Sequence, residues 1–280
     1  MPYKQDGTID ALQRRAQWLR IETLKIHRTA PGTRLTSSLS CVEILTALYY
    51  GKCLRYKSND PLWEKRDRFI ASKGHGSIAL YPLLADLGFF PSSELSKVCS
   101  NGALLGNIPD CNIPGIETVN GSLGHGLPVG CGIALGLRCK KSSARVFVMV
   151  GDGELYEGAN WEAAMFAGHH KLNNLTLIID NNKTSMLGRC KDIINWVQFE
   201  DKFKAFGWKV LKVDGHDTLA VQKALMYFKN SRVSRPGVLV CDTVKGKGID
   251  ILENDPLSHI RSLNTEEADF YINKLAAKVK

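Results

Sequence analysis

Two apolar segments joined by a helical stretch constrain the fold of this 280-residue chain more than any other feature. Val146–Val150 is a continuous apolar run that stops at Gly151, and Leu175–Ile179 is a second such run that stops at Asp180. Runs of this length and composition are typical of strands buried on both faces of a parallel sheet. Between them, the segment from Ala159 to Lys171 has the apolar spacing of a helix.

A strand, a helix and a second strand in this order predict a right-handed crossover, so the two strands run parallel. Asp152 follows the first strand and Asn182 follows the second, and we expect both at the carboxyl edge, where open α/β sheets bind ligands. Their oxygen atoms suit Mg²⁺, with Ca²⁺ as an alternative, and Mg²⁺ usually adds phosphate oxygens and water to a few protein groups. Gly153 lets the backbone come close to a phosphate. The unit therefore predicts a metal–diphosphate site, unless Asp152 merely caps a helix.

Further motifs accompany this unit along nearly the whole chain. In order and spacing they resemble the motifs of the transketolase family, and in particular the N-terminal subunit of a split, thiamine diphosphate-dependent transketolase. The residues that carry the resemblance are Ser72-Lys73-Gly74-His75-Gly76, Pro114-Gly115-Ile116-Glu117, Gly121-Ser122-Leu123-Gly124-His125-Gly126, the Gly151-Asp152-Gly153 unit with Glu157, Gly158 and Asn182, Asp214-Gly215-His216-Asp217, and Thr243-Val244-Lys245-Gly246-Lys247-Gly248.

The resemblance implies an α/β thiamine diphosphate-binding fold, with a mostly parallel central sheet and helices on both faces. We expect one domain over residues 1–280, since 44% apolar residues in a chain of this length can bury one large core. Three further strands are expected at Arg68–Ala71, Trp208–Val213 and Val238–Asp242. The helices are expected at residues 9–28, from Ser40 through a capping box with Glu43, at Ser77–Leu87, across the glycine-rich residues 121–136, at Leu219–Lys229, and at 265–277 with Asn264 as N-cap.

The resemblance also assigns roles to individual residues. His75 and His259 match family histidines that approach the cofactor diphosphate and the reacting sugar, and imidazoles suit the proton transfers of the reaction. The cation is expected on Asp152, Asn182 and the backbone carbonyl of Thr184. Cofactor-binding residues are expected to be His75, Gly121, Leu123, Gly153, Glu157, Asn182, Met186 and His259. Among these, Glu157 matches an acid at the subunit contact, and Met186 falls where the family has an apolar residue against the thiazolium.

Two positions depart from the family pattern. Arg34 stands where related N-terminal subunits have a substrate-binding histidine, and Asn107 stands where they have a second one. Arginine is always charged and offers a planar set of donors, whereas asparagine cannot exchange a proton at neutral pH. We therefore expect a substrate other than the usual pair of simple sugar phosphates, unless a local realignment brings other residues to these places.

By resemblance, the chemistry is transfer of a two-carbon ketol unit from a ketose to an aldose, with thiamine diphosphate as electron sink. The glutamate that activates the cofactor belongs to a second domain in this family, and the chain ends at Lys280 without room for it. We therefore expect the partner to be a C-terminal transketolase subunit and the assembly to be a heterotetramer. The alternatives are the α-subunit of a 2-oxo acid dehydrogenase, which the Ser72–Gly76 and Gly121–Gly126 motifs disfavour, and a non-catalytic scaffold, for which Asp152 together with Asn182 would have no use.

Composition points to a cytoplasmic protein that acts on small molecules. The formal net charge is +9, but the lysines and arginines are scattered, which favours anionic substrates such as sugar phosphates over nucleic acid. The eight cysteines form no Cys-x-x-Cys pair, which is typical of reduced core thiols. The chain has no apolar leader and no apolar span of 18 residues, so we expect neither secretion nor membrane insertion.

Overall fold

The computed structural model describes residues 9–186, 188–195, 198–230, 234–253 and 255–277. Its centre is a five-stranded sheet with the order β1-β2-β3-β5-β4, in which every neighbouring pair is parallel. The strands are β1 (Arg68–Ala71), β2 (Val146–Gly151), β3 (Leu175–Asn181), β4 (Lys209–Asp214) and β5 (Gly237–Asp242). All five expected strands are therefore present, and the expected parallel crossover from β2 to β3 is confirmed.

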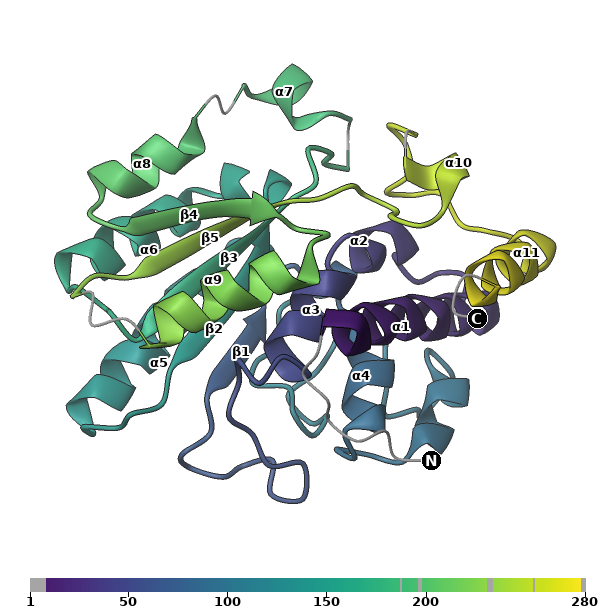
Figure 1. Cartoon of the computed structure of the whole chain (residues 1–280), viewed down its shortest axis with the longest axis horizontal. Helices are drawn as coiled ribbons and strands as arrows, with labels where there is room; N and C mark the ends of the chain where they lie inside the picture. The colour runs from purple at the N-terminus through teal and green to yellow at the C-terminus, as the bar shows by residue number, and fades with distance from the viewer. Residues whose placement is uncertain (1–8, 187, 196–197, 231–233, 254, 278–280) are drawn as a thin grey trace.

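Helices cover both faces of the sheet (Figure 1). Alternate residues of the strands point to opposite sides: Phe147 and Met149 pack into one apolar cluster, whereas Val146, Val148 and Val150 pack into another. The first cluster lies under helices α1 (Ile9–Thr29), α3 (Val42–Tyr49), α4 (Leu80–Asp86) and α9 (Thr218–Asn230), and the second lies under α5 (Gly126–Cys139), α6 (Gly158–His169) and α8 (Phe199–Ala205). The doubly covered α/β fold expected from the sequence is confirmed.

The remaining elements are short, apart from the last helix. They are α2 (Leu35–Leu39), α7 (Cys190–Ile193), α10 (Asp250–Glu253), α11 (Thr265–Ala276) and the 3₁₀ turns η1 (Gly74–Gly76), η2 (Ser92–Lys97) and η3 (Gly153–Tyr156). Asn264 caps α11 as expected, since its side chain accepts from the backbone N–H of Glu267 in a complete capping box. No helix in the described ranges combines the length and apolarity needed to span a membrane.

The capping box expected at Ser40 is wrong. The helix begins at Val42, with Cys41 at its N-cap and no side-chain cap. The hydroxyl of Ser40 donates instead to the carboxylate of Asp180 at 2.6 Å, and Glu43 accepts a hydrogen bond from Arg20, also at 2.6 Å. The side chains of Ser40 and Glu43 thus bond to buried charged residues of other elements and do not cap the helix.

Glycines allow the segment from Gly121 to Gly136 to approach β1 and β2 closely. A Cβ on Gly126 would lie 2.3 Å from the Cβ of Ser72, and a Cβ on Gly130 would lie 2.5 Å from Val148. A Cβ on Gly132 or Gly136 would meet no atom within 4 Å, so these two glycines are not needed for the close approach. The close approach matters because it places the start of α5 directly over the carboxyl end of β1.

Candidate active site

A cavity of about 470 Å³ opens where the carboxyl ends of β1, β2 and β3 meet the loops that follow them. Every residue that the sequence assigned to the metal, the cofactor or the chemistry lines this cavity: His75, Gly121, Leu123, Asp152, Gly153, Glu157, Asn182, Thr184, Met186 and His259. These residues come from segments that lie far apart in the chain, so the fold rather than the local sequence brings them together.

The carboxylate of Asp152 lies directly beside the turn that carries Asn182. One of its oxygens accepts from the backbone N–H of Lys183 at 2.6 Å, and the other accepts from Gly153 at 2.9 Å. Burial and the charge of Asp180 raise the pKa of Asp152 to about 6. A buried carboxylate with a raised pKa is stabilised when a cation binds it.

Two neighbouring oxygens complete this part of the cavity. The side-chain oxygen of Asn182 accepts from the backbone N–H of Thr184 at 3.2 Å. The carbonyl of Thr184 accepts from the ammonium of Lys245 at 2.9 Å, so a positive charge already lies at the third position expected to bind a cation. No group of three His, Cys, Asp or Glu side chains suited to a metal occurs among the residues described. A cation here would rely on one carboxylate, one amide, one carbonyl and oxygens of its ligand, which is a donor set that fits Mg²⁺ bound to a diphosphate.

A buried ion pair holds the floor of the cavity. The ammonium of Lys73 contacts the carboxylate of Asp180, and both side chains are almost completely buried. Burial would raise the pKa of Asp180, but the charge of Lys73 and hydrogen bonds from Lys73, Ser40 and Thr243 hold it below its usual value. Lys73 also donates to the carbonyl of Ser37 at 2.9 Å. The pair therefore fixes α2 and the turn after β1 to the end of β3.

Ser37 lies in the wall of the cavity, but its hydroxyl is enclosed by the protein and has no hydrogen-bond partner among the residues described. An unsatisfied buried hydroxyl costs about 1–3 kcal/mol. The fit of the cavity to thiamine diphosphate therefore rests on the oxygens of Asp152, Asn182 and Thr184 and on the ammonium of Lys245.

His75 and His259 form a pair inside the cavity. Their ring centroids are 5.2 Å apart, and Lys245 lies 2.9 Å from Nδ1 of His259. Burial, followed by the charges of neighbouring lysines and of the other ring, lowers the pKa of His75 to about 3. Burial and the charges of Lys245 and Arg34 lower the pKa of His259 to about 4. Both rings are therefore neutral at neutral pH. Because an ammonium can only donate to Nδ1, His259 carries its own hydrogen on Nε2.

Sequence reasoning missed three residues that shape the cavity. Glu154 is buried and accepts from Ser72, from the N–H of Gly124 at 2.9 Å and from that of Gly151 at 3.2 Å, which ties three loops together. Lys73 and Lys245 carry the positive charges, and burial together with nearby Lys73 lowers the pKa of Lys245 to about 8. The signal for both lysines was present, because each belongs to a motif already singled out, but neither had been given a role.

The two departures from the family pattern differ in position. Arg34 is half-buried and lines the cavity. Asn107 is exposed and is not among the lining residues. The next residue, Ile108, packs closely against Gly74, since a Cβ placed on Gly74 would lie 3.2 Å from it. The structure thus brings Arg34 to the site and leaves Asn107 outside it. His216 makes structural hydrogen bonds outside the cavity lining: it contacts Glu43 at 3.0 Å and accepts from the backbone N–H of Val244 at 2.8 Å.

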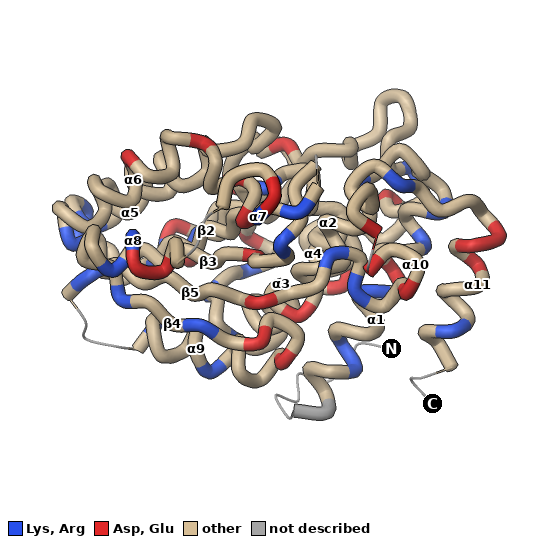
Figure 2. Tube along the Cα trace, turned by 90° about the horizontal axis from the view of Figure 1, so that it is seen from above, with Lys and Arg blue, Asp and Glu red and all other residues tan. Residues whose placement is uncertain are grey.

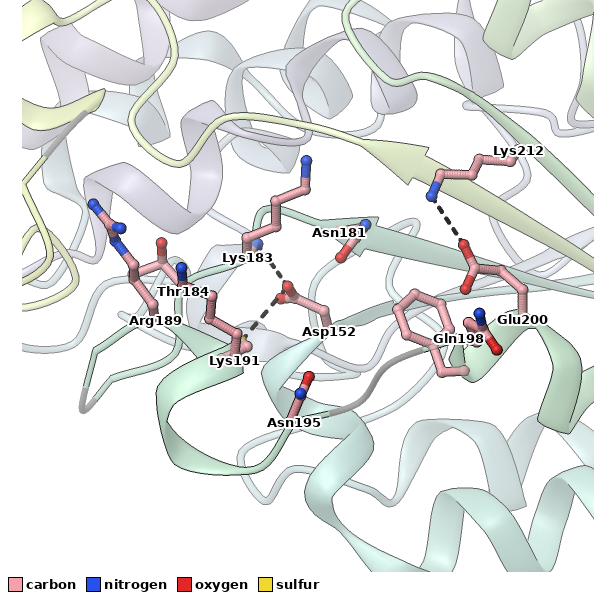
Figure 3. Close-up of a pocket in the computed structure, with 12 residues that line it drawn as sticks. Asp152, Asn181, Lys183, Thr184, Arg189, Lys191, Asn195, Gln198, Glu200 and Lys212 are labelled. Atoms are coloured by element: carbon pink, nitrogen blue, oxygen red, sulfur yellow. Dashed lines mark hydrogen bonds and ion pairs between the residues drawn. The ribbon is translucent and has the colours of Figure 1, made fainter.

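A second cavity, of about 520 Å³, lies on the other side of Asp152 (Figure 3). Its walls carry Lys183, Lys191 and the pair Lys212–Glu200, in which the two charged groups are 2.9 Å apart. It shares Asp152 and Thr184 with the first cavity, but among the residues described no histidine and no glycine lines it. The first cavity is therefore the one that brings together all the residues expected to form the site.

Comparison with known proteins identifies the class. The family model "Transketolase, thiamine diphosphate binding domain" matches residues 13–278. The chain therefore belongs to the transketolase family and is a transketolase-type N-terminal subunit, as the motifs predicted. Thiamine diphosphate binding and transferase chemistry are general features of this family.

Two similar proteins are separate subunits of about this length. The chain is 36% identical to a subunit of the apulose-4-phosphate transketolase of Actinobacillus succinogenes over 271 residues, which cover 95% of this chain and 96% of that one. It is 37% identical to "6-deoxy-6-sulfo-D-fructose transketolase subunit SqwG" of a Clostridium species over 257 residues, which cover 91% and 92%. The crystal structure of transketolase from Campylobacter jejuni superposes with a TM-score of 0.82 at 27% identity, over 95% of this chain but only 48% of that chain.

Proposed function

We propose that this chain is the diphosphate-binding subunit of an enzyme that transfers a ketol unit from a ketose to an aldehyde acceptor. The observation that carries this proposal is the single cavity in which all the expected residues meet. Asp152, Asn182 and the carbonyl of Thr184 would hold Mg²⁺ or, alternatively, Ca²⁺. Lys245 and the backbone at Gly153 would face the diphosphate, and Lys73 would add positive charge from the floor of the cavity. Gly121, Leu123 and Met186 would line the thiazolium, which supplies the electron sink when bound.

The histidine pair would handle the protons of the reaction. A neutral His259 with its hydrogen on Nε2 can donate to a substrate oxygen, and Lys245 holds the ring in that form through Nδ1. A neutral His75 has a ring nitrogen that can accept a hydrogen bond from a substrate hydroxyl. General acid–base groups contribute about 10²- to 10⁴-fold to a rate when their pKa lies near the working pH.

Exposed apolar side chains around the cavity support a partner subunit. Met186 is 55% exposed and Ile193 is 38% exposed, although both line the cavity. Leu257 and Ile260, on either side of His259, are 56% and 54% exposed. We call these four residues the apolar rim. A contiguous apolar surface around a polar site is typical of a protein interface. In the proposed complex a C-terminal transketolase subunit covers the rim and supplies the glutamate that activates the cofactor, with Glu157 at the contact.

A second exposed apolar surface, on α5 and α6, supports a larger assembly. Val129, Met165 and Phe166 are each at least 39% exposed, and the two helices pack side by side. In the proposed assembly a pair of complexes uses this surface, while the rim holds the partner subunit. The assembly proposed is a heterotetramer.

We propose that the enzyme works in the cytoplasm on sugars or sugar phosphates, without nucleic acid or membrane. Figure 2 shows Lys and Arg interspersed with Asp and Glu along the chain.

Reconstitution tests the proposal. The purified chain, mixed with thiamine diphosphate and Mg²⁺, is expected to give no ketol transfer, and addition of the C-terminal subunit is expected to restore it. A double substitution in the rim, Leu257→Ser with Ile260→Ser, should weaken association with the partner while leaving the cofactor affinity of the chain unchanged. Exposed Leu62, far from the cavity lining, provides the control substitution Leu62→Ser. Full turnover by the chain alone would refute the partner requirement.

A further inference from the structure

Arg34 is a cation inside the proposed active site that no other part of the described chain neutralises. Its side chain is half-buried and lines the cavity together with His75 and His259. Among the described residues, the guanidinium makes no ion pair, and the only side-chain hydrogen bond to this residue is accepted by its backbone carbonyl, from Ser38. A partly desolvated guanidinium without an anion is an incomplete arrangement, since arginine stays charged in proteins.

The backbone on both sides of Arg34 is fixed by hydrogen bonds of neighbouring residues, so the side chain starts from a defined position at the cavity. The hydroxyl of Thr33 donates to the carbonyl of Ala30 at 2.8 Å. The hydroxyl of Thr36 donates to the carbonyl of Ser258 at 3.0 Å, which joins the Arg34 segment to the residue just before His259. Arg34 and His259 are therefore anchored to each other through buried bonds rather than through the ligand.

The other cations of the cavity already have partners. Lys73 is paired with Asp180, and Lys245 donates to the carbonyl of Thr184 and lies against His259. The positive charge of Lys245 acts on both Asp152 and His259, and that of Arg34 acts on His259 as well. Among these three cations of the cavity, Arg34 is therefore the one that has no partner in the described chain.

We propose that Arg34 selects a substrate with a carboxylate or similar planar oxyanion attached to, or one carbon away from, its reacting carbonyl. This inference rests on the proposed ketol transfer. A guanidinium binds a carboxylate through two parallel hydrogen bonds, which neutral hydroxyls cannot match. Simple sugar phosphates carry their anion at the far end of the carbon chain, away from the histidines. In transfer to such an aldehyde acid, the bond between C2 and C3 of the donor ketose breaks, the C3 hydroxyl loses its proton, and the shortened aldose leaves. The new bond then joins the ketol carbonyl carbon to the aldehyde carbon. The aldehyde oxygen takes up a proton, and the carboxylate passes unchanged into the product.

The test compares two acceptors that differ in one group. Glyoxylate has a carboxylate beside the aldehyde, and glycolaldehyde has a neutral hydroxymethyl group there. With the reconstituted complex and one fixed neutral ketose donor, wild type is expected to prefer glyoxylate in kcat/KM. Arg34→Gln should lose about tenfold to hundredfold on glyoxylate and change by less than about threefold on glycolaldehyde. Arg34→Lys should recover part of the loss.

Arg261→Gln is the matched control, because it removes one positive charge near His259 from a side chain that pairs with Asp255 and does not line the cavity. It is expected to leave the ratio between the two acceptors unchanged. An equal loss on both acceptors in Arg34→Gln, or an unchanged ratio, would overturn the proposal. A weaker affinity of Arg34→Gln for thiamine diphosphate would also overturn it and assign the residue to the cofactor.

Direct binding separates this inference from the proposed function. Glycolate is an unreactive carboxylate, and calorimetry can measure its affinity for the cofactor-loaded complex without any turnover. About tenfold tighter binding to wild type than to Arg34→Gln would support the site even if every ketol transfer assay fails. Equal affinities would sink it even if the complex is an active transketolase.

Discussion

The cavity is built by two groups of residues that differ in how they are held. The strand-end group, Lys73, Asp152, Asn182 and Thr184, follows directly after strands and is fixed by backbone hydrogen bonds and a buried ion pair. The loop group, Arg34, Met186, Ile193 and His259, comes from short or irregular segments and is flanked by exposed apolar side chains. The two groups also differ in proposed task. The first group suits the metal and the diphosphate of the cofactor, which is common to the family. The second group suits the substrate and the partner subunit, which vary, although Met186 and His259 would also contact the cofactor.

The largest expected effect comes from Asp152, in the strand-end group. Asp152→Ala should abolish metal-dependent binding of thiamine diphosphate while the fold remains intact, because the carboxylate is the only anionic group proposed for the cation. Calorimetry with the partner present measures the affinity, and circular dichroism checks the fold. Asp214→Ala is the control, since Asp214 also ends a strand but does not line the cavity. An unchanged affinity of Asp152→Ala for thiamine diphosphate would show that the strand-end group does not bind the cofactor.

The second effect concerns stability and compares the two groups directly. Lys73→Met leaves the carboxylate of Asp180 buried without its ammonium, and we expect a loss of about 3–5 kcal/mol in the free energy of unfolding. The double substitution Lys73→Met with Asp180→Leu should recover much of this loss. Arg34→Gln, in the loop group, should change stability by less than about 0.5 kcal/mol. Urea unfolding of the chain without cofactor measures all three, and similar losses in the two groups would contradict the comparison.

The smallest effect is a dependence on pH. As the pH rises, the stability of the cofactor-free chain should fall and the affinity for the metal should increase. Folding raises the pKa of Asp152 from 3.8 to about 6. The cofactor-free chain should therefore lose up to about 3 kcal/mol of stability as the pH rises from about 4 to above 6, because the buried carboxylate becomes charged. Metal affinity should rise over the same range, since the cation needs the charged form. Asp152→Asn should remove this contribution from the unfolding curves, and a curve identical to that of wild type would exclude Asp152 as its source.

Asp152 and Asn182 of the strand-end group were predictable because their place follows from the chain direction. Two apolar runs with a helix between them fix two parallel strands, and their last residues must meet at one edge. Continuous apolar runs also mark β5, because it is buried like β2 and β3. The edge strand β4 is partly exposed and gives a weaker signal, and Lys73 was given no role.

The rest depended on contacts between distant segments. Ser40 and Glu43 have the pattern of a helix cap, yet Asp180 and Arg20 reach them from other elements and form stronger interactions. Nothing local in the sequence of Lys245 reveals that its ammonium lies on the carbonyl of Thr184. The position of a loop residue relative to the sheet cannot be read from the sequence. Arg34 was therefore noticed only because it differs from the histidine of the family pattern, and Asn107 was expected at the site although it does not line the cavity.

The bond from Thr36 to Ser258 closes the cavity with residues that lie 222 positions apart in the chain. During synthesis, the segment around His259 leaves the ribosome long after α2 and the first strands have appeared. Contacts of such sequence separation form late and slow the search for the native state. A nascent chain that stops before Ser258 would thus have its metal ligands but no finished pocket. Completion of the proposed cofactor site accordingly depends on a contact that cannot form until Ser258 has been synthesised.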